Sequence, residues 1–259
     1  MKARTALRFG VLGSLEVTRD GQPVPVRAAK QRIALATLLL RAGQYVSVDQ
    51  LIQRTWDGHA PGEARNAMQT HIARLRRTVG EDGQSLIHTH DDGYSVQLPP
   101  ESLDLTRFRD LAHAAALAAK RHDLAGEARL LSDALALWRG PVLADVPSGP
   151  LHRLEIPQLV EERLRLLERS FDVHLRLGRH DRIVAGLKAA TTEHPLHERL
   201  WAQLMLSLYR SGRRAEALET YRNVVVLLRE ELGIDPGHEL ARLHQAVLAD
   251  DPDLAHRPD

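Results

Sequence analysis

The chain has 259 residues, of which 43% are hydrophobic and 27% charged, with a net charge of +1 and no cysteine. This length and composition suggest about two globular domains, and the lack of cysteine excludes disulfides, thiolate metal sites and cysteine nucleophiles. No long uncharged apolar run is present and the N-terminal stretch does not resemble a signal peptide, so we expect a cytoplasmic protein without contact to a membrane.

The nearly neutral net charge hides an asymmetry along the chain. Residues 1–100 carry 13 Lys and Arg against 9 Asp and Glu, whereas residues 101–259 carry 22 against 25. A basic N-terminal part is typical of a region that meets an anionic partner. Taken alone, the difference is small enough to be a chance feature of a solvated surface.

The first 26 residues predict a small antiparallel sheet. Short apolar runs alternate through "LRFGVLGSLEVTRDGQPVPV", and the Asp20-Gly21 pair is a strong signal for a hairpin turn. Pro23 and Pro25 confine the strand after the turn to an edge of the sheet, because proline has no N–H to donate.

Three helices are predicted next. Ile33, Ala36, Leu39 and Leu40 fall at helical spacing, and Gly43 ends that helix. Ser47 and Gln50 have the spacing of a capping box, so a second helix begins there and includes Trp56 on its apolar face. After a break at "DGHAPG", a third helix carries one apolar stripe and ends near Gly80. The stripe consists of Met68, Ile72, Leu75 and Val79.

The face of the third helix opposite the stripe is polar and basic. Segment 62–79 has four arginines and one acid. Arginine binds guanine, glutamine binds adenine, and threonine contacts the methyl group of thymine, while a small residue allows close approach to the groove. The residues expected to contact bases are therefore Gln69, Thr70, Ala73 and Arg74. Basic residues near the end of the helix are better placed for phosphates, although a solvated basic face of an ordinary helix remains the alternative.

"SLIHTH" and "YSVQL" read as two short strands around a "DDG" turn that contains Gly93, and "PPES" marks a boundary near residue 100. His88 and His90 would share one face of a strand, and His-x-His followed by carboxylates resembles the zinc ligands of metallo-β-lactamase-type hydrolases. That motif would continue with a further histidine where this chain has Gly93. We therefore expect no metal and no catalytic residue here.

The rest of the chain is expected to be helical throughout and contains a repeat. "LRLGRHDRIVAGL" and "LYRSGRRAEALETY" align so that Gly178 and Gly212 lie 34 residues apart, which is the tetratricopeptide period. Such repeats stack on each other and present a groove to partners. Further along, "ELGIDPGHEL" ends one helix with Gly233 as C-cap and begins the next, with Pro236 in its first turn.

Three helices followed by a hairpin, with a sheet before the first helix, resemble the OmpR/PhoB-type winged helix-turn-helix. "THIARLRRTVG" looks like the recognition helix of that family and "DGYSVQL" like its wing. Together with the helical second half, and with "LLREELGIDPGHELARLHQAVLADDP", the chain resembles the Streptomyces antibiotic regulatory protein (SARP) activators. The expected fold is mainly α with small antiparallel β elements. A winged helix-turn-helix over residues 1–100 would precede an all-α tetratricopeptide-like bacterial transcriptional activation domain over residues 101–259.

The resemblance implies a sequence-specific activator of a secondary-metabolite gene cluster, which binds direct repeats in double-stranded DNA as a homodimer and recruits RNA polymerase holoenzyme. It places Trp56 against the DNA backbone. The full set expected to contact the backbone is Lys30, Arg32, Trp56, Arg65, Asn66, Arg76, Arg77, His88, Thr89 and His90. Asp91 and Asp92 depart from the family, in which arginine is common at this place. Phosphates would repel both carboxylates, so the wing tip is expected to point away from DNA or to contribute little.

Two competing functions remain open. The helical half could be the active part of a scaffold that sequesters a partner protein, which predicts weak and non-specific DNA affinity. A hydrolase that uses His88 and His90 predicts stoichiometric zinc. Neither a GxxxxGK[ST] phosphate loop nor a GxSxG nucleophile elbow occurs in the sequence. We therefore expect no enzyme and no cofactor.

Overall fold

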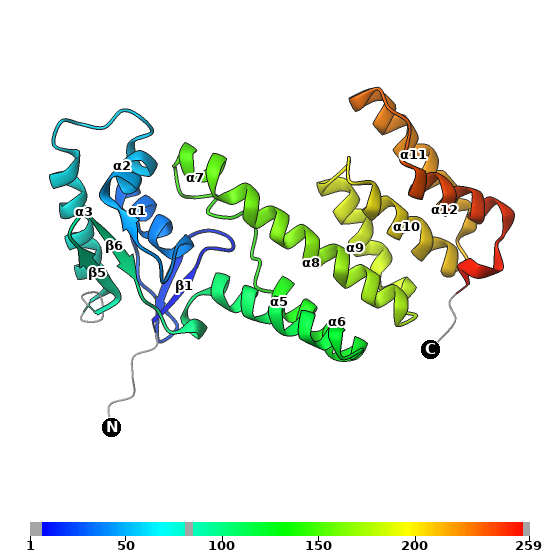
Figure 1. Ribbon diagram of the computed structural model, residues 1–259, viewed down its shortest axis with the longest axis horizontal. Coiled ribbons are helices and arrows are strands. Elements are labelled where there is room, and N and C mark those ends of the chain that lie inside the picture. The colour runs from blue at the N-terminus through cyan, green and yellow to red at the C-terminus, as the bar shows by residue number, and fades with distance from the viewer. Residues whose placement is uncertain (1–6, 81–84, 256–259) are drawn as a thin grey trace. The chain divides into compact units, whose positions relative to one another are not determined.

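The computed structural model describes residues 7–80 and 85–255. The chain divides into two compact units that do not follow a single cut in the sequence. The N-terminal unit contains residues 1–113 and 133–163, and the C-terminal unit contains residues 114–132 and 164–259. The expected class, mainly α with small antiparallel sheets in the N-terminal part, is confirmed (Figure 1).

The N-terminal sheet is built from β1 (Leu7–Gly10), β2 (Glu16–Arg19) and β3 (Gln22–Pro23) in that order. Arg19 pairs with Gln22, so Asp20 and Gly21 form the whole turn. Both residues have positive φ, 51° and 80°, as a type I′ turn requires. The predicted hairpin is therefore confirmed, and β3 lies at the edge, as its proline requires.

Three helices follow: α1 (Ala29–Leu40), α2 (Val48–Trp56) and α3 (Ala64–Val79). Residues 33–39 of α1 are all buried, which is typical of a central helix packed on every side. Ser47 caps α2, because its side chain accepts the Gln50 N–H while the Gln50 side chain accepts the Ser47 N–H. This is the predicted capping box, and the predicted apolar stripe of α3 is fully buried as well.

The second sheet has the order β4-β6-β5, with β4 at Val46–Ser47, β5 at Ile87–His90 and β6 at Gly93–Val96. The β5–β6 hairpin is the predicted wing, but Gly93 is not in its turn. Gly93 pairs with His90 and with Ser47, so Asp91 and Asp92 alone form the turn. A Cβ atom at Gly93 would lie 2.4 Å from the Val46 carbonyl oxygen, which explains why glycine stands there. The two-residue strand β4 was not predicted.

After the 3₁₀ turn η1 (Pro100–Ser102) come α5 (Asp104–Lys120), α6 (Leu124–Leu135), α7 (Gly149–Leu154) and α8 (Ile156–Arg176). The expectation of continuous helix is wrong for residues 136–148, which are irregular. This segment packs into the N-terminal unit: the N–H groups of Arg139 and Leu143 donate to the carbonyls of Leu12 and Gly13. Leu143 is fully buried.

The C-terminal unit contains α9 (His180–Glu193), α10 (Glu198–Arg210), α11 (Arg214–Leu232) and α12 (His238–Ala249), followed by η2 (Pro252–Leu254). Gly178 and Gly212 occupy equivalent turns and have φ of 69° and 73°. The predicted repeat of 34 residues thus joins α8 to α9 and α10 to α11. Gly233 is the left-handed C-cap of α11 as expected, but Pro236 lies before α12 rather than in its first turn.

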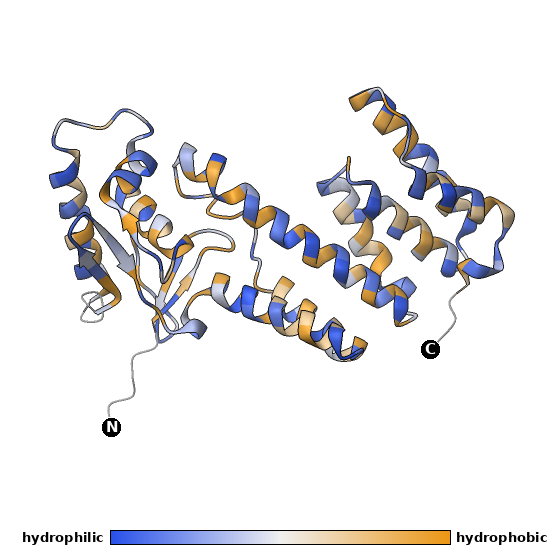
Figure 2. Cartoon of the chain, viewed as in Figure 1, coloured by the Kyte–Doolittle hydropathy of each residue, from blue (hydrophilic) through white to orange (hydrophobic). Residues whose placement is uncertain are grey.

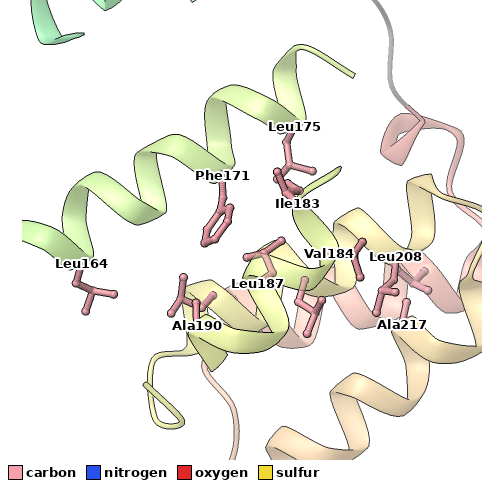
Figure 3. Close-up of a cluster of buried hydrophobic side chains, with 12 residues drawn as sticks. Leu164, Phe171, Leu175, Ile183, Val184, Leu187, Ala190, Leu208 and Ala217 are labelled. Atoms are coloured by element: carbon pink, nitrogen blue, oxygen red, sulfur yellow. The ribbon is translucent and has the colours of Figure 1, made fainter. Parts of the chain in front are cut away.

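A core of leucine and other apolar residues holds the repeat together. Figure 3 shows Phe171 and Leu175 on α8 close to Ile183 and Leu187 on α9, and all four are buried. Orange and blue residues alternate along α8 in Figure 2, as expected for an amphipathic helix. In the described part of the chain, none of the helices has the length and apolar character needed to cross a membrane.

Candidate nucleic-acid interface

The polar face of α3 is exposed along its length. Its buried stripe is at most 1% exposed, because it packs against α1 and α2. The exposed residues of the helix include Arg65, Asn66, Gln69, Thr70, Ala73, Arg74 and Arg77. All four predicted base-contacting residues therefore lie together on one solvent-facing surface, which we call the α3 face.

The side chains at the centre of the α3 face are not committed to the protein. Within residues 7–80 and 85–255, Gln69, Arg74 and Arg77 form no side-chain hydrogen bond or ion pair, whereas the Thr70 hydroxyl donates to the Asn66 carbonyl of the same helix. Free guanidinium and amide groups at the centre of an exposed helix can pair with base edges without first breaking a contact.

Arg65, at the start of α3, is held by two carboxylates. Its Nη2 lies 2.8 Å from Asp49 Oδ1 at the start of α2, and its Nη1 donates to Asp92 at the wing tip. The Asp92 hydrogen bond and both negative charges raise the pKa of Arg65. Asp92 therefore does not act as an isolated negative charge. Its carbonyl also accepts the Tyr45 hydroxyl and the Val48 N–H, so the wing tip is fastened to the helices.

Arg76 joins α3 to the wing. Its Nη2 donates to the carbonyl of Ile87 and, at 2.8 Å, to the hydroxyl of Thr89, both on β5. Its guanidinium also lies over the ring of Tyr94 on β6, 6.0 Å from the centroid. The structure thus places Arg76 and Thr89 in a contact within the protein, whereas Arg77 remains exposed.

Lys30 and Trp56 come together although they belong to different helices. Lys30 Nζ lies 4.6 Å from the centre of the Trp56 ring, and the His71 ring of α3 lies on Trp56 with 6.2 Å between centroids. α1 begins beside them with no side-chain cap and no acidic residue in its first turn. Positive charge thus gathers at this corner of the three helices.

Arg32, which was also expected to contact the DNA backbone, lies away from Lys30 and Trp56 in a contact within the protein. Its guanidinium pairs with Asp145 and donates to the Val26 carbonyl, and its side chain is only 19% exposed. Asp145 also accepts the Leu15 N–H, so it anchors segment 136–148 on the sheet. The structure therefore gives Arg32 a role within the protein and does not bring it to the α3 face.

The wing histidines are partly committed as well. His90 Nε2 lies 2.9 Å from Ser95 Oγ, and its ring contacts Tyr45 edge-on, whereas His88 is half-buried on β5. Among the described residues no group of three or more His, Cys, Asp or Glu is arranged to hold a metal ion.

Two features of this surface, and one elsewhere in the N-terminal unit, were not predicted from the sequence. One is the pairing of Arg65 with Asp49 and Asp92, and another is the position of His71 beside Trp56. The third is Glu155, which pairs with two arginines. Its Oε1 lies 3.0 Å from Nη2 of Arg41, just after α1, and 2.8 Å from Nη2 of Arg54 in α2. Of the three, only the position of His71 had a local signal in the sequence, because His71 neighbours the apolar stripe of α3. The two ion-pair clusters join residues far apart in sequence, and helical periodicity does not reveal such contacts.

Known proteins match this arrangement over almost its whole length. A family model for the C-terminal part of transcriptional regulatory proteins matches residues 21–96, and one for the bacterial transcriptional activator domain matches residues 103–248. The regulatory protein DnrI of Streptomyces peucetius is 34% identical over 96% of this chain and 94% of its own length. The chain belongs to the SARP family of transcriptional regulators.

Other SARP relatives are longer than this chain. The regulatory protein AfsR of Streptomyces coelicolor is 44% identical over 96% of the chain, which spans only 25% of AfsR. The solved structure of Mycobacterium tuberculosis EmbR in complex with a low affinity phosphopeptide superimposes with a TM-score of 0.88 at 35% identity. It covers 96% of this chain, which corresponds to 66% of the EmbR chain. The OmpR/PhoB-type winged helix, the activator-domain class and the role in transcription regulation follow from this membership.

Proposed function

We propose that the protein is a sequence-specific DNA-binding activator that acts in the cytoplasm without an enzymatic step. It recognises direct repeats near a promoter as a homodimer, and it recruits RNA polymerase to a secondary-metabolite gene cluster. The observation that carries the proposal is the α3 face, where the uncommitted side chains of Gln69, Arg74 and Arg77 stand exposed beside a paired wing.

The proposed division of labour follows from which side chains are free. Gln69, Thr70, Ala73 and Arg74 lie where α3 would be deepest in the major groove, and they read base edges. Asn66, Arg77, Lys30 and Trp56 flank them and contact phosphates, which set the register of the protein on the duplex. Arg65, Arg76 and Arg32 contribute mainly by holding the wing and the sheet in place, because their donors already have acceptors within the protein.

The test is selection of bound duplexes from a random pool, with wild type and Arg74→Ala in parallel at about 0.15 M salt, where non-specific phosphate binding is already weakened. We expect wild type to enrich a short motif repeated in the same orientation, and Arg74→Ala to lose preference at one base position of it. Arg77→Ala is the matched control, one helical turn further on, and should keep the motif while binding more weakly. Enrichment of the same motif by Arg74→Ala would remove Arg74 from the base-reading set.

A scaffold function is the second candidate. It rests on an apolar groove between α11 and α12, lined by Leu218, Tyr221, Arg222, Val225, Val226, His244 and Leu248. Val226 and Leu248 are about half exposed there, so the groove offers apolar surface to a partner. If neither wild type nor a variant enriches any duplex in the selection, the result would favour the scaffold function, with this groove binding a protein partner.

A further inference from the structure

His71 is a titratable residue at the edge of the α3 face that no part of the proposed function uses. Its ring lies against Trp56 and is half-buried. Its Nδ1 atom is buried without a hydrogen-bond partner, and no hydrogen bond to Nε2 occurs in the described part of the chain either. The ring is therefore held in place by packing, while both nitrogens stay uncommitted.

The charges around His71 all have the same sign. The groups that act on it are Lys30 of α1 and Arg74 of α3, whereas α2 contributes the uncharged ring of Trp56. Neither Lys30 nor Arg74 forms an ion pair with a carboxylate among the described residues. Burial lowers the pKa of His71, and the positive charges of Lys30 and Arg74 lower it further. In the free protein His71 is thus neutral at physiological pH.

An anion bound beside His71 would favour its protonated form instead of the neutral one. A phosphate between Lys30 and His71 supplies the negative charge that the corner lacks, and an opposite charge within a few ångströms favours the protonated imidazole. The flat Trp56 ring behind them excludes water from one side, which strengthens the attraction. DNA offers phosphates at regular spacing beside any helix that lies in its major groove.

We propose that Lys30, Trp56 and His71 form a seat for one phosphate of the DNA backbone, and that His71 takes up a proton from solvent when the phosphate enters. The proposal rests on the proposed DNA binding and adds a residue and a pH dependence to it. Arg74 stays on the base edges and acts on the seat only through its charge. DNA affinity therefore increases as the pH falls towards the ordinary pKa of histidine, about 6.5.

The experiment measures the dissociation constant for a random-sequence duplex at about 0.05 M salt between pH 8 and pH 6, because a phosphate contact does not depend on sequence. Wild type should bind about three- to tenfold more tightly at pH 6, since uptake of one proton changes affinity by at most tenfold per pH unit. His71→Gln, which is also a good helix former, should lack this gain between pH 8 and pH 6. Its thermal denaturation, followed by circular dichroism, checks that the variant is folded.

Two further variants sharpen the test. His71→Arg carries a permanent charge, so it should bind at pH 8 about as tightly as wild type does at pH 6, without dependence on pH. His113→Gln alters an exposed histidine on α5, away from the residues expected to contact DNA, and should keep the wild-type dependence on pH. The proton resonance of the His71 ring, followed by NMR, should report a higher pKa with DNA than without it.

The outcomes separate the two proposals. If wild type binds the duplex equally at pH 6 and pH 8, or if His71→Gln keeps the full gain, the phosphate seat is overturned while DNA binding stands. If wild type binds no duplex at any pH, the proposed function itself fails, and the seat with it.

Discussion

At the scale of single residues, the four arginines of α3 are divided into two classes. Arg74 and Arg77 are exposed and uncommitted, whereas Arg65 and Arg76 bind the wing. All four are arginines outside the apolar stripe of the same helix, so the sequence could not show which of them bind the wing and which stay exposed. What separates them is the position of β5 and of the wing turn, which bring acceptors to two arginines and none to the others.

Asp92→Asn should increase DNA affinity. The substitution removes one of the two carboxylates that hold Arg65, and it takes away a negative charge next to the proposed DNA-binding face. We expect tighter binding to cognate and random duplexes alike, and a salt dependence steeper by about one phosphate contact. Equilibrium binding at several salt concentrations measures both. Asp91→Asn, in the same turn but outside the Arg65 pair, is the control and should change the affinity less. Weaker binding by Asp92→Asn would show that the wing must be fastened for the α3 face to work.

Arg76→Ala and Arg77→Ala should differ in kind. Arg76 donates to the Ile87 carbonyl and the Thr89 hydroxyl, so its loss should lower the free energy of unfolding by about 1–2 kcal/mol. Arg77 is exposed, so its loss should leave stability unchanged and weaken binding to every duplex. Chemical denaturation and binding to random DNA separate the two effects. Equal stability of both variants would mean that the Arg76 contacts contribute nothing measurable.

At the scale of elements, sequence patterns correctly predicted the features that depend on residues close together in the chain. The Asp20-Gly21 turn, the Ser47 capping box and the stripe of α3 each depend on residues within one turn or one helix, and all three are confirmed. The short strand β4 and the placement of Gly93 were missed, because strand pairing joins Val46 to Tyr94 across 48 positions. The pairing of Arg32 with Asp145, which lies 113 positions away, was not predicted either, and a contact of Arg32 with DNA stays a prediction.

Ser47→Ala should destabilise the N-terminal unit through α2. The substitution removes the acceptor of the Gln50 N–H and half of the reciprocal capping box, which costs about 1 kcal/mol. Thermal denaturation followed by circular dichroism should show a lower midpoint. Ser47→Asp retains a capping acceptor and should recover most of the loss. A Ser47→Ala variant as stable as wild type would assign the start of α2 to the packing of Val48 and Leu51 instead.

At the scale of the whole molecule, sequence order and spatial units differ. The boundary near residue 100 stays a prediction; the two family models match residues 21–96 and 103–248. The N-terminal compact unit nevertheless contains residues 133–163. Because α7 lies within residues 133–163, we expect the stability of the N-terminal unit to depend on it. Ser148 illustrates this dependence, because its hydroxyl donates to the Arg54 carbonyl at the end of α2 at 2.6 Å.

Glu155 is the residue through which this dependence can be tested by pH. Burial alone would raise the pKa of Glu155, but the hydrogen bonds from Arg54 and Arg41 outweigh burial and hold the pKa below its usual range. A carboxyl group whose pKa is lower in the folded state stabilises the fold above its unfolded pKa, about 4.3. This contribution is lost as the pH falls from there through the folded pKa.

Glu155→Gln should therefore lower the free energy of unfolding of the N-terminal unit by about 2 kcal/mol at pH 7, because Arg54, only 9% exposed, loses its counter-charge. The gap between wild type and variant should stay constant down to pH 5 and shrink below about pH 4, as the wild-type carboxyl becomes protonated. Calorimetric unfolding across this range measures it, and exposed Glu101→Gln, on the same unit, should show no gap. A gap that persists undiminished at the lowest pH would mean that the shape of Glu155, and not its charge, joins α1 and α2 to the segment that follows α7.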